Sequence, residues 1–278
     1  MGRKSAQSGK DDEAERQAIL ERLGACDIST LRRLRGLLES AGDASAETET
    51  GRGYLDYLSA VAESDVSGLK RAEKSYGNSW KRRGGIDTFH MLTRKWDRLE
   101  KRVASASDQG AAPYDILQHI AEDRRAEGII DDVRDLRRYL TLVEAESAAR
   151  SALGAPDSGR QYLDWLASIS RGDVSEILQK QKAYGSSWKR RGGVAVFMML
   201  ARKWDRIEQR VALRVPPAAG SPGANPNNIF EHIAADRRTE GILDDVRDLR
   251  RYLMLVEAEM AARGLVETGT SRDNREQD

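Results

Sequence analysis

The stretch Tyr76–Val103, YGNSWKRRGGIDTFHMLTRKWDRLEKRV, occurs a second time as Tyr184–Val211, YGSSWKRRGGVAVFMMLARKWDRIEQRV. The two stretches agree at 20 of 28 positions, and His119–Glu146 agrees with His232–Glu259 at 24 of 28. A repeat of about a hundred residues that occurs twice indicates a duplicated domain rather than a solenoid. The duplication also provides an internal comparison, because residues that differ between the copies are poor candidates for a role that both copies share.

The pattern of apolar residues predicts helices. One face of a long helix is marked in the quoted stretch by Phe89, Leu92, Trp96, Leu99 and Val103. A last helix is expected from about residue 127 to 150, and Asp65 is expected to cap a helix that ends at Gly77. The two adjacent glycines of each copy predict a loop. No segment alternates as a strand does, so the predicted fold class is all-α.

The repeat divides the chain into four parts. We expect a partly disordered N-terminal extension with short helices over residues 1–48, a first helical repeat over 49–150, a second over 156–264 and a disordered tail over 265–278. The repeats are expected to form two tandem helical bundles that pair as an internal pseudo-dimer, because a duplicated unit with a self-complementary surface can bury it against its own copy. Further assembly into a homo-oligomer stays open.

Composition excludes several classes of site. The 278 residues include 46 Lys and Arg against 45 Asp and Glu, and a net charge of +1 gives no global attraction to nucleic acid or to a membrane. Cys26 is the single cysteine, which excludes an intrachain disulfide and a cysteine-based zinc site, and the presence of only three histidines argues against a His-rich metal site. The first residues lack the apolar core of a signal peptide, and no apolar run reaches membrane-spanning length. We therefore expect a soluble, cytoplasmic protein without a membrane partner.

Acidic residues stand three apart on two successive predicted helices. In the first copy these are Asp97 and Glu100, then Asp132 and Asp135; in the second they are Asp205 and Glu208, then Asp245 and Asp248. Residues at this spacing share a helix face, so the four acids of a copy could converge and hold Mg²⁺ or Mn²⁺. The alternative is that they form ordinary ion pairs with the many arginines and lysines beside them.

A basic loop precedes the long helix in both copies. Its residues are Trp80, Lys81, Arg82 and Arg83, repeated as Trp188, Lys189, Arg190 and Arg191, and each set is followed by two glycines. Glycines let backbone amides approach a ligand, and cations at a helix start favour phosphate. A tryptophan could stack on a base, which makes this loop a candidate nucleotide site bordering the acids. The alternative is a surface turn that is anchored by a buried tryptophan.

Together, these acidic pairs and the run DDVRDLRRYL resemble the MazG-like, all-α NTP pyrophosphohydrolase superfamily, whose pattern is ExxE followed by ExxD. The combination YGxSW, RKWDRxE and DDVRDLRRYL is most similar to a phage-associated relative, the nucleotide-modification-associated helical domain. The resemblance covers each repeat and implies paired helical bundles, carboxylate-bound Mg²⁺ and a nucleoside triphosphate ligand. Two glutamates of the family pattern are aspartates here, which shortens their reach.

Three functions follow from these observations. The first is Mg²⁺-dependent hydrolysis of a nucleoside triphosphate or a related phosphorylated nucleotide. The second is a non-catalytic module that binds or sequesters a nucleotide. The third is a nucleic-acid-binding or helical scaffold protein, against which the near-zero net charge argues.

Overall fold

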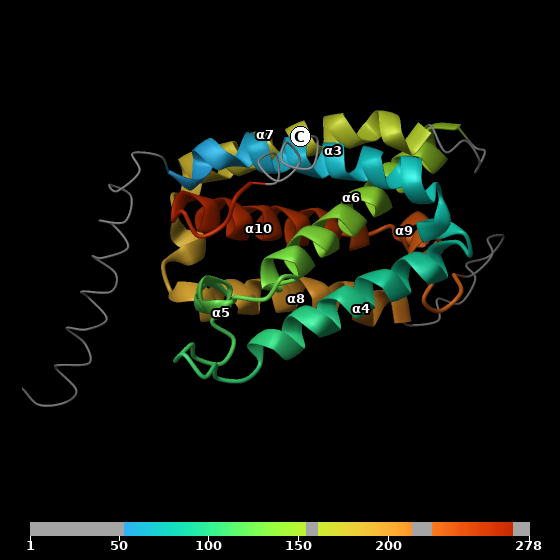
Figure 1. Ribbon diagram of the computed structural model, residues 1–278. Coiled ribbons are helices and arrows are strands. Elements are labelled where there is room, and N and C mark those ends of the chain that lie inside the picture. The colour runs from blue at the N-terminus through green and yellow to red at the C-terminus, as the bar shows by residue number, and fades with distance from the viewer. Residues whose placement is uncertain (1–52, 154–160, 213–223, 269–278) are drawn as a thin grey trace, which may run out of the picture. The chain divides into compact units, whose positions relative to one another are not determined.

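The computed structural model describes residues 53–153, 161–212 and 224–268, and these form helices and connecting loops with no strand among them (Figure 1). All of them belong to one compact unit, Arg52–Asp278. The predicted all-α fold class is therefore confirmed. The predicted N-terminal extension and the C-terminal tail beyond residue 268 lie outside the described residues. The predicted start of the disordered tail at residue 265 is wrong, because Val266 packs on the core and Glu267 O accepts from Arg134.

Both copies contain the same order of elements except for η1, which has no separate counterpart in the second copy. The first copy consists of η1 (Tyr54–Tyr57), α3 (Leu58–Tyr76), η2 (Ser79–Lys81), α4 (Gly85–Val103), α5 (Ile116–Glu122) and α6 (Ile129–Leu153). The second consists of α7 (Gln161–Tyr184), η3 (Ser187–Lys189), α8 (Gly192–Ala212), α9 (Ile229–Ala235) and α10 (Ile242–Ala262). The predicted long middle helix and the last helix are thus present in each repeat.

The helices of the two copies are interleaved. The first helices α3 and α7 pack against each other, α6 packs on α10, and α4 and α8 pack on α6 and α10 respectively (Figure 1). The short helices are exchanged, because α5 of the first copy contacts α8 and α9 of the second contacts α4. One buried apolar cluster therefore contains residues of both repeats.

Stacked aromatic rings fill the space between α4 and α8. Trp96 stacks on Trp204 with ring centroids 5.5 Å apart, and each tryptophan also stacks on the phenylalanine of the other copy, Phe197 at 5.7 Å or Phe89 at 6.1 Å. All four side chains are nearly inaccessible to solvent. Their helical spacing predicted burial, and the structure shows that they are buried against the other repeat.

The two glycines of each basic loop have different structural roles. Gly84 and Gly192 have φ of 74° and 75°, a left-handed conformation that favours glycine. Gly85 begins α4 and Gly193 is the second residue of α8, and each lies where the other repeat's short helix starts. A Cβ on Gly193 would lie 1.9 Å from Asp115 Oδ1, so the absence of a side chain permits this approach. The close backbone approach expected for a ligand is made here by the partner repeat.

The predicted cap at Asp65 is wrong. Helix α3 runs without interruption from Leu58 to Tyr76, and Asp65 is buried in its middle. Its carboxylate accepts hydrogen bonds from Arg137 and Arg138 on α6. Because a buried carboxylate needs cationic partners, its pairing with side chains more than seventy positions away determines its role, and the local pattern does not reveal it.

Buried ion pairs connect the two repeats. Arg137 donates both to Asp65 and to Glu257 Oε2 on α10, the latter at 2.6 Å, and Arg134 donates to Glu257 Oε1 at 2.8 Å. The second copy repeats the arrangement, since Arg250 contacts Asp173 and Glu144. The pairs place the start of each of α6 and α10 beside the end of the other, so these helices run in opposite directions.

Candidate functional site

The acids of α6 and α10 are held by cations of the preceding long helix. Asp132 is fully buried and accepts from Arg98 and from Arg102 Nη1 at 2.6 Å, while Asp135 lies 2.5 Å from Lys95 Nζ. In the second copy, Arg206 and Arg210 pair with Asp245, and Lys203 and Lys180 pair with Asp248. These four acids therefore form ion pairs with lysine and arginine, which was the alternative to metal binding.

The acids of α4 and α8 lie toward those of the other copy. Burial raises the pKa of Glu208, and the charges of Asp97, Asp205 and Glu100 raise it further, so Glu208 lies within electrostatic range of these three carboxylates. None of the four forms a hydrogen bond or ion pair within the part of the chain that the structure describes. Among the same residues, no group of three or more acidic, histidine or cysteine side chains is placed to hold a metal ion.

The predicted donor set of one copy is therefore divided between two environments. Asp132 and Asp135 are already neutralised by arginine and lysine, and Asp97 and Glu100 lie near the other repeat's acids. A divalent cation would have to compete with fixed guanidinium groups for the first pair. The residues as arranged do not fit the predicted magnesium site, which stays a prediction.

The lysine of each basic loop points inward. Lys81 Nζ lies 2.6 Å from Glu146 Oε2 and 5.0 Å from the centre of the Tyr162 ring. In the second copy, Lys189 Nζ lies 2.8 Å from Glu259 and 5.0 Å from the Tyr54 ring. The arginines that follow them, Arg82, Arg83, Arg190 and Arg191, are exposed. Glu146 is eleven residues beyond Asp135 on α6, about 16 Å of helix rise, so the lysine does not border its own copy's predicted metal acids.

Each loop tryptophan packs edge-on against a tyrosine of the other repeat. The ring centroids are 5.5 Å apart for Trp80 and Tyr162, and 5.7 Å apart for Trp188 and Tyr54. Both indole Nε1 atoms are buried without a hydrogen-bond partner. The Trp80 N–H is near enough to the Tyr162 phenol to oppose the rise that burial causes in its pKa, but the two groups do not meet hydrogen-bond geometry. Two equivalent donors thus lack an acceptor.

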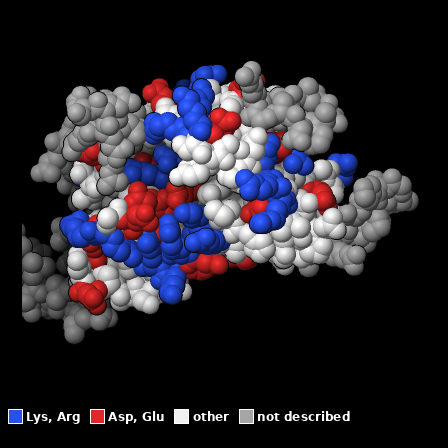
Figure 2. All heavy atoms as spheres, turned by 45° about the vertical axis from the view of Figure 1, so that its right-hand side comes forward, with Lys and Arg blue, Asp and Glu red and all other residues white. Residues whose placement is uncertain are grey.

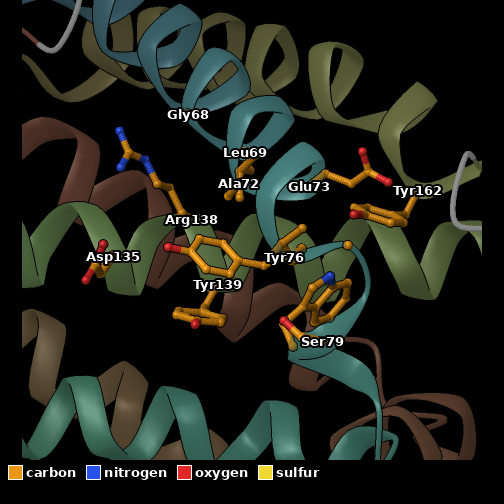
Figure 3. A pocket seen from close by; sticks show the side chains of 13 residues that line it. Gly68, Leu69, Ala72, Glu73, Tyr76, Ser79, Asp135, Arg138, Tyr139 and Tyr162 are labelled. Atoms are coloured by element: carbon orange, nitrogen blue, oxygen red, sulfur yellow. The ribbon is translucent and has the colours of Figure 1, made fainter. Parts of the chain in front are cut away.

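These tryptophans line two grooves at equivalent positions. Groove 1, of about 370 Å³, is lined by residues that include Leu69, Tyr76, Trp80, Asp135, Arg138, Tyr139 and Leu142 (Figure 3). Groove 2, of about 450 Å³, is lined by their equivalents Ile177, Tyr184, Trp188, Asp248, Arg251, Tyr252 and Leu255. Most of each wall comes from the first and last helices of one copy and from its basic loop; Tyr162 of α7 also lines groove 1, and Met199 of α8 also lines groove 2. Trp80 therefore shares groove 1 with Asp135, and Trp188 shares groove 2 with Asp248.

Several groove residues carry no local signal of function. Tyr76 and Tyr184 are 74% and 70% exposed at the ends of α3 and α7, which is unusual for large aromatic side chains. Tyr139 follows the apolar run of the last helix and has the appearance of a core residue in the sequence. Burial, and then Asp135, raises the pKa of Tyr139, so its phenol remains a hydrogen-bond donor. Agreement between copies was the one signal that could have found these tyrosines.

A polar pocket adjoins groove 1. Its cavity of about 400 Å³ shares Tyr76 and Ser79 with the groove and is also lined by Lys81, Arg82 and Arg150. Three cations here face one acid, Glu146, which binds both Lys81 and Arg150. An aromatic groove therefore continues into a positively charged pocket.

The two grooves differ in charge. Groove 1 is lined by the carboxylates Glu73 and Asp135 and the guanidinium of Arg138. In groove 2 the equivalent of Glu73 is Gln181, and Ala72 is replaced by Lys180. The lining charge is thus −1 in groove 1 and +1 in groove 2, because groove 2 combines Asp248 with Lys180 and Arg251.

Charge elsewhere on the described surface is mixed. Figure 2 shows Lys and Arg side chains lying directly beside Asp and Glu on one face rather than forming a patch of one sign. Among the described residues, no helix has the length and apolar character needed to cross a membrane. No family model, curated protein or solved structure matches this chain. The resemblance to the MazG-like superfamily therefore stays a prediction.

Proposed function

We propose that this protein binds a phosphorylated nucleotide, or a ligand of the same chemistry, in grooves 1 and 2. The observation that supports the proposal most is the occurrence, at equivalent positions of both repeats, of an aromatic groove with an unpartnered indole N–H. A buried donor without an acceptor costs about 1–3 kcal/mol, which a ligand acceptor would offset. The same feature in both copies argues against an accident of packing.

The base would lie among the tyrosines. Tyr76 and Tyr139 line groove 1 together, with Arg138 and Asp135 on one side of them and Glu73 on the other (Figure 3). Stacking of a base on an aromatic side chain contributes about 1–3 kcal/mol and tolerates any base. The Trp80 N–H and the Tyr139 hydroxyl would then donate to ring nitrogens or carbonyls of the base.

The phosphates would lie in the adjoining polar pocket. Arg82 and Arg150 both line this pocket beside Tyr76, so both can reach an anion that enters it. Arg150 also binds Glu146. Lys81 is bound by Glu146 and adds positive charge to the lining of the same pocket. Hydrogen bonds between guanidinium groups and phosphate are among the strongest that proteins make.

Binding without cleavage is the form of the proposal that the geometry favours. Four of the eight acids predicted to hold Mg²⁺ are paired with lysine or arginine, and hydrolysis of this type requires carboxylates free to bind the metal. The pyrophosphohydrolase interpretation remains the second candidate. The nearness of Glu208 to the charges of Asp97, Asp205 and Glu100 supports it, since clustered carboxylates attract cations.

We also propose that the two repeats act as an internal pseudo-dimer. Each contact between repeats has a counterpart, such as α5 on α8 and α9 on α4, or Lys81 beside Tyr162 and Lys189 beside Tyr54. Reciprocal contacts of this kind characterise an isologous interface. One chain would then present two nucleotide sites.

A nucleotide panel tests the proposal. The full chain is incubated with nucleoside mono-, di- and triphosphates, with and without Mg²⁺, and ligand and products are followed by mass spectrometry after native separation. We expect retained, uncleaved nucleotide. Release of pyrophosphate or phosphate that depends on Mg²⁺ would establish the second candidate, and the absence of any retained or altered nucleotide would contradict both.

A further inference from the structure

The chain reverses direction immediately after α10. Gly264 has a φ of 69°, its N–H donates to Ala261 O at 2.9 Å, and Leu265 N donates to Met260 O at 3.0 Å. This left-handed turn ends the helix and requires glycine for an unstrained backbone. The equivalent position after α6 is Ser151, which is helical and donates to Ser147 O, so α6 continues to Leu153.

The returning segment covers part of the first repeat. Leu265, Val266 and Glu267 lie against a surface that includes Ile120, Ile130 and Arg134. Val266 packs on the apolar core. Arg134 Nη2 donates to the backbone carbonyl of Glu267 at 2.5 Å, and this charge-assisted bond ties the segment to α6.

The same surface of the second repeat lines a cavity of about 550 Å³. Ile233, Leu243 and Arg247 are the equivalents of the three covered residues, and all three line this cavity together with Ser147 and Trp165. Residues around it are more exposed than their counterparts in the first repeat. Trp165 is 39% exposed, whereas its equivalent Tyr57 is half-buried. Ile169 is partly exposed, whereas its equivalent Val61 is fully buried.

Arg247 has the geometry of Arg134 but lacks its backbone partner. Both arginines use Nε to bind a glutamate of the antiparallel helix, Glu257 for Arg134 and Glu144 for Arg247, at 2.8 and 2.7 Å. Both use Nη1 to approach an aspartate three residues earlier. The Nη2 of Arg134 binds a carbonyl, and within the described ranges the Nη2 of Arg247 binds no group.

Two further donors in this cavity lack an acceptor. Arg250 Nη1 and Ser147 Oγ are buried without a hydrogen bond, although the two residues are only 2% and 8% exposed. At the covered surface, the equivalent Nη1, that of Arg137, reaches Leu253 O at 3.5 Å, and the equivalent of Ser147 is the apolar Met260 on α10. A ligand that offers carbonyl oxygens would satisfy these donors.

We propose that this cavity is a docking site for a short extended peptide from a partner protein, with two adjacent aliphatic side chains followed by a backbone carbonyl. The chemistry of the occupant is that of Leu265–Glu267 on the first repeat. The counterpart of Val266, which packs on the core, would cover Ile233 and Leu243, while the counterpart of Leu265, which is 47% exposed, would lie at the edge of the cavity. The carbonyl would accept from Arg247 Nη2. The cavity shares Arg251 with groove 2, but the proposed contacts use other residues and do not depend on nucleotide binding.

Peptide binding to the full chain tests the proposal. The probe is a fluorescein-labelled peptide with the sequence of residues 263–268, RGLVET, followed by fluorescence anisotropy up to about 1 mM protein. We expect saturable binding, and a loss of at least about tenfold in affinity in Arg247→Lys, which keeps the charge but removes Nη2. The matched variant Arg134→Lys, which alters the covered surface, should not weaken binding.

A second peptide, with aspartate in place of the valine, tests the apolar part of the site and should bind at least about tenfold more weakly. Three results would overturn the proposal. These are the absence of saturable binding by the parent protein, equal loss in Arg134→Lys and Arg247→Lys, and unchanged affinity for the aspartate peptide.

Discussion

Replacing Glu257 by glutamine should weaken the connection between the repeats more than any surface change. Glu257 is 1% exposed and accepts from Arg134 at 2.8 Å and from Arg137 at 2.6 Å. The variant would leave Arg137 buried with one anionic partner instead of two, and would set an amide beside its guanidinium. Breaking a buried pair in this way costs about 3–5 kcal/mol of unfolding free energy. Urea denaturation followed by circular dichroism measures the loss.

The matched control is Asp87→Asn, which alters the exposed pair of Arg83 and Asp87 at 3.6 Å and should cost less than about 1 kcal/mol. Burial opposes ionisation of Glu257, but Arg137 and Arg134 outweigh it and hold its pKa below the ordinary value of 4.5. Its contribution is therefore present above about pH 5 and is lost as the pH falls through the lowered pKa. A loss no larger than that of the control, or an acid dependence unchanged by Glu257→Gln, would refute this reasoning.

Two further changes test the grooves and the exchange of short helices. Ala72→Lys combined with Glu73→Gln gives groove 1 the lining charge of groove 2. Titration calorimetry should show about tenfold tighter nucleoside triphosphate binding at groove 1, since each of the two charge units contributes on the order of 0.5–1 kcal/mol near a protein surface. Unchanged affinity would exclude the argument that lining charge sets the affinity. Gly193→Ala would place a Cβ 1.9 Å from Asp115 Oδ1 and should lower the melting temperature. The control Gly172→Ala, whose Cβ would have nothing within 4 Å, should leave the melting temperature unchanged or raise it. Similar melting temperatures of the two variants would contradict the close approach of Asp115 to Gly193.

Helix type and the core positions were predictable from the sequence because they depend on local periodicity. Phe89 and Trp96 occupy one stripe, and the apolar stripe of an amphipathic helix packs against the core. The loop at Gly84 was also predictable from local sequence, since adjacent glycines disfavour a continuous helix.

Long-range pairing was not predictable in the same way. In the sequence Asp65 resembles a helix cap, and only the fold shows that it pairs with Arg137. The role of Gly193 likewise depends on the nearby Asp115 of the other repeat. The acids illustrate the same limit. Spacing of three places Asp132 and Asp135 on one helix face, but it does not specify whether a metal or a lysine faces them.

The candidate site was predictable in part. Trp80 and Trp188 stood out as repeated aromatics beside cations, and both line a groove. The tyrosines that complete the grooves lie on the first and last helices of each repeat. In the sequence, an aromatic residue that lines a groove there cannot be distinguished from one that is buried in the core. Comparison between the repeats narrows such candidates, but the cavity itself is a property of packing.

Nucleotide stoichiometry measured by titration calorimetry tests the central claim most directly. Tyr76 and Tyr184 are 74% and 70% exposed, so their replacement by alanine should cost little stability while removing one aromatic wall from each groove. The account predicts two sites per chain in the parent protein, one strong site in Tyr76→Ala and in Tyr184→Ala, and neither in the double variant. Binding that keeps its stoichiometry and affinity in the double variant would contradict the assignment of nucleotide binding to these grooves.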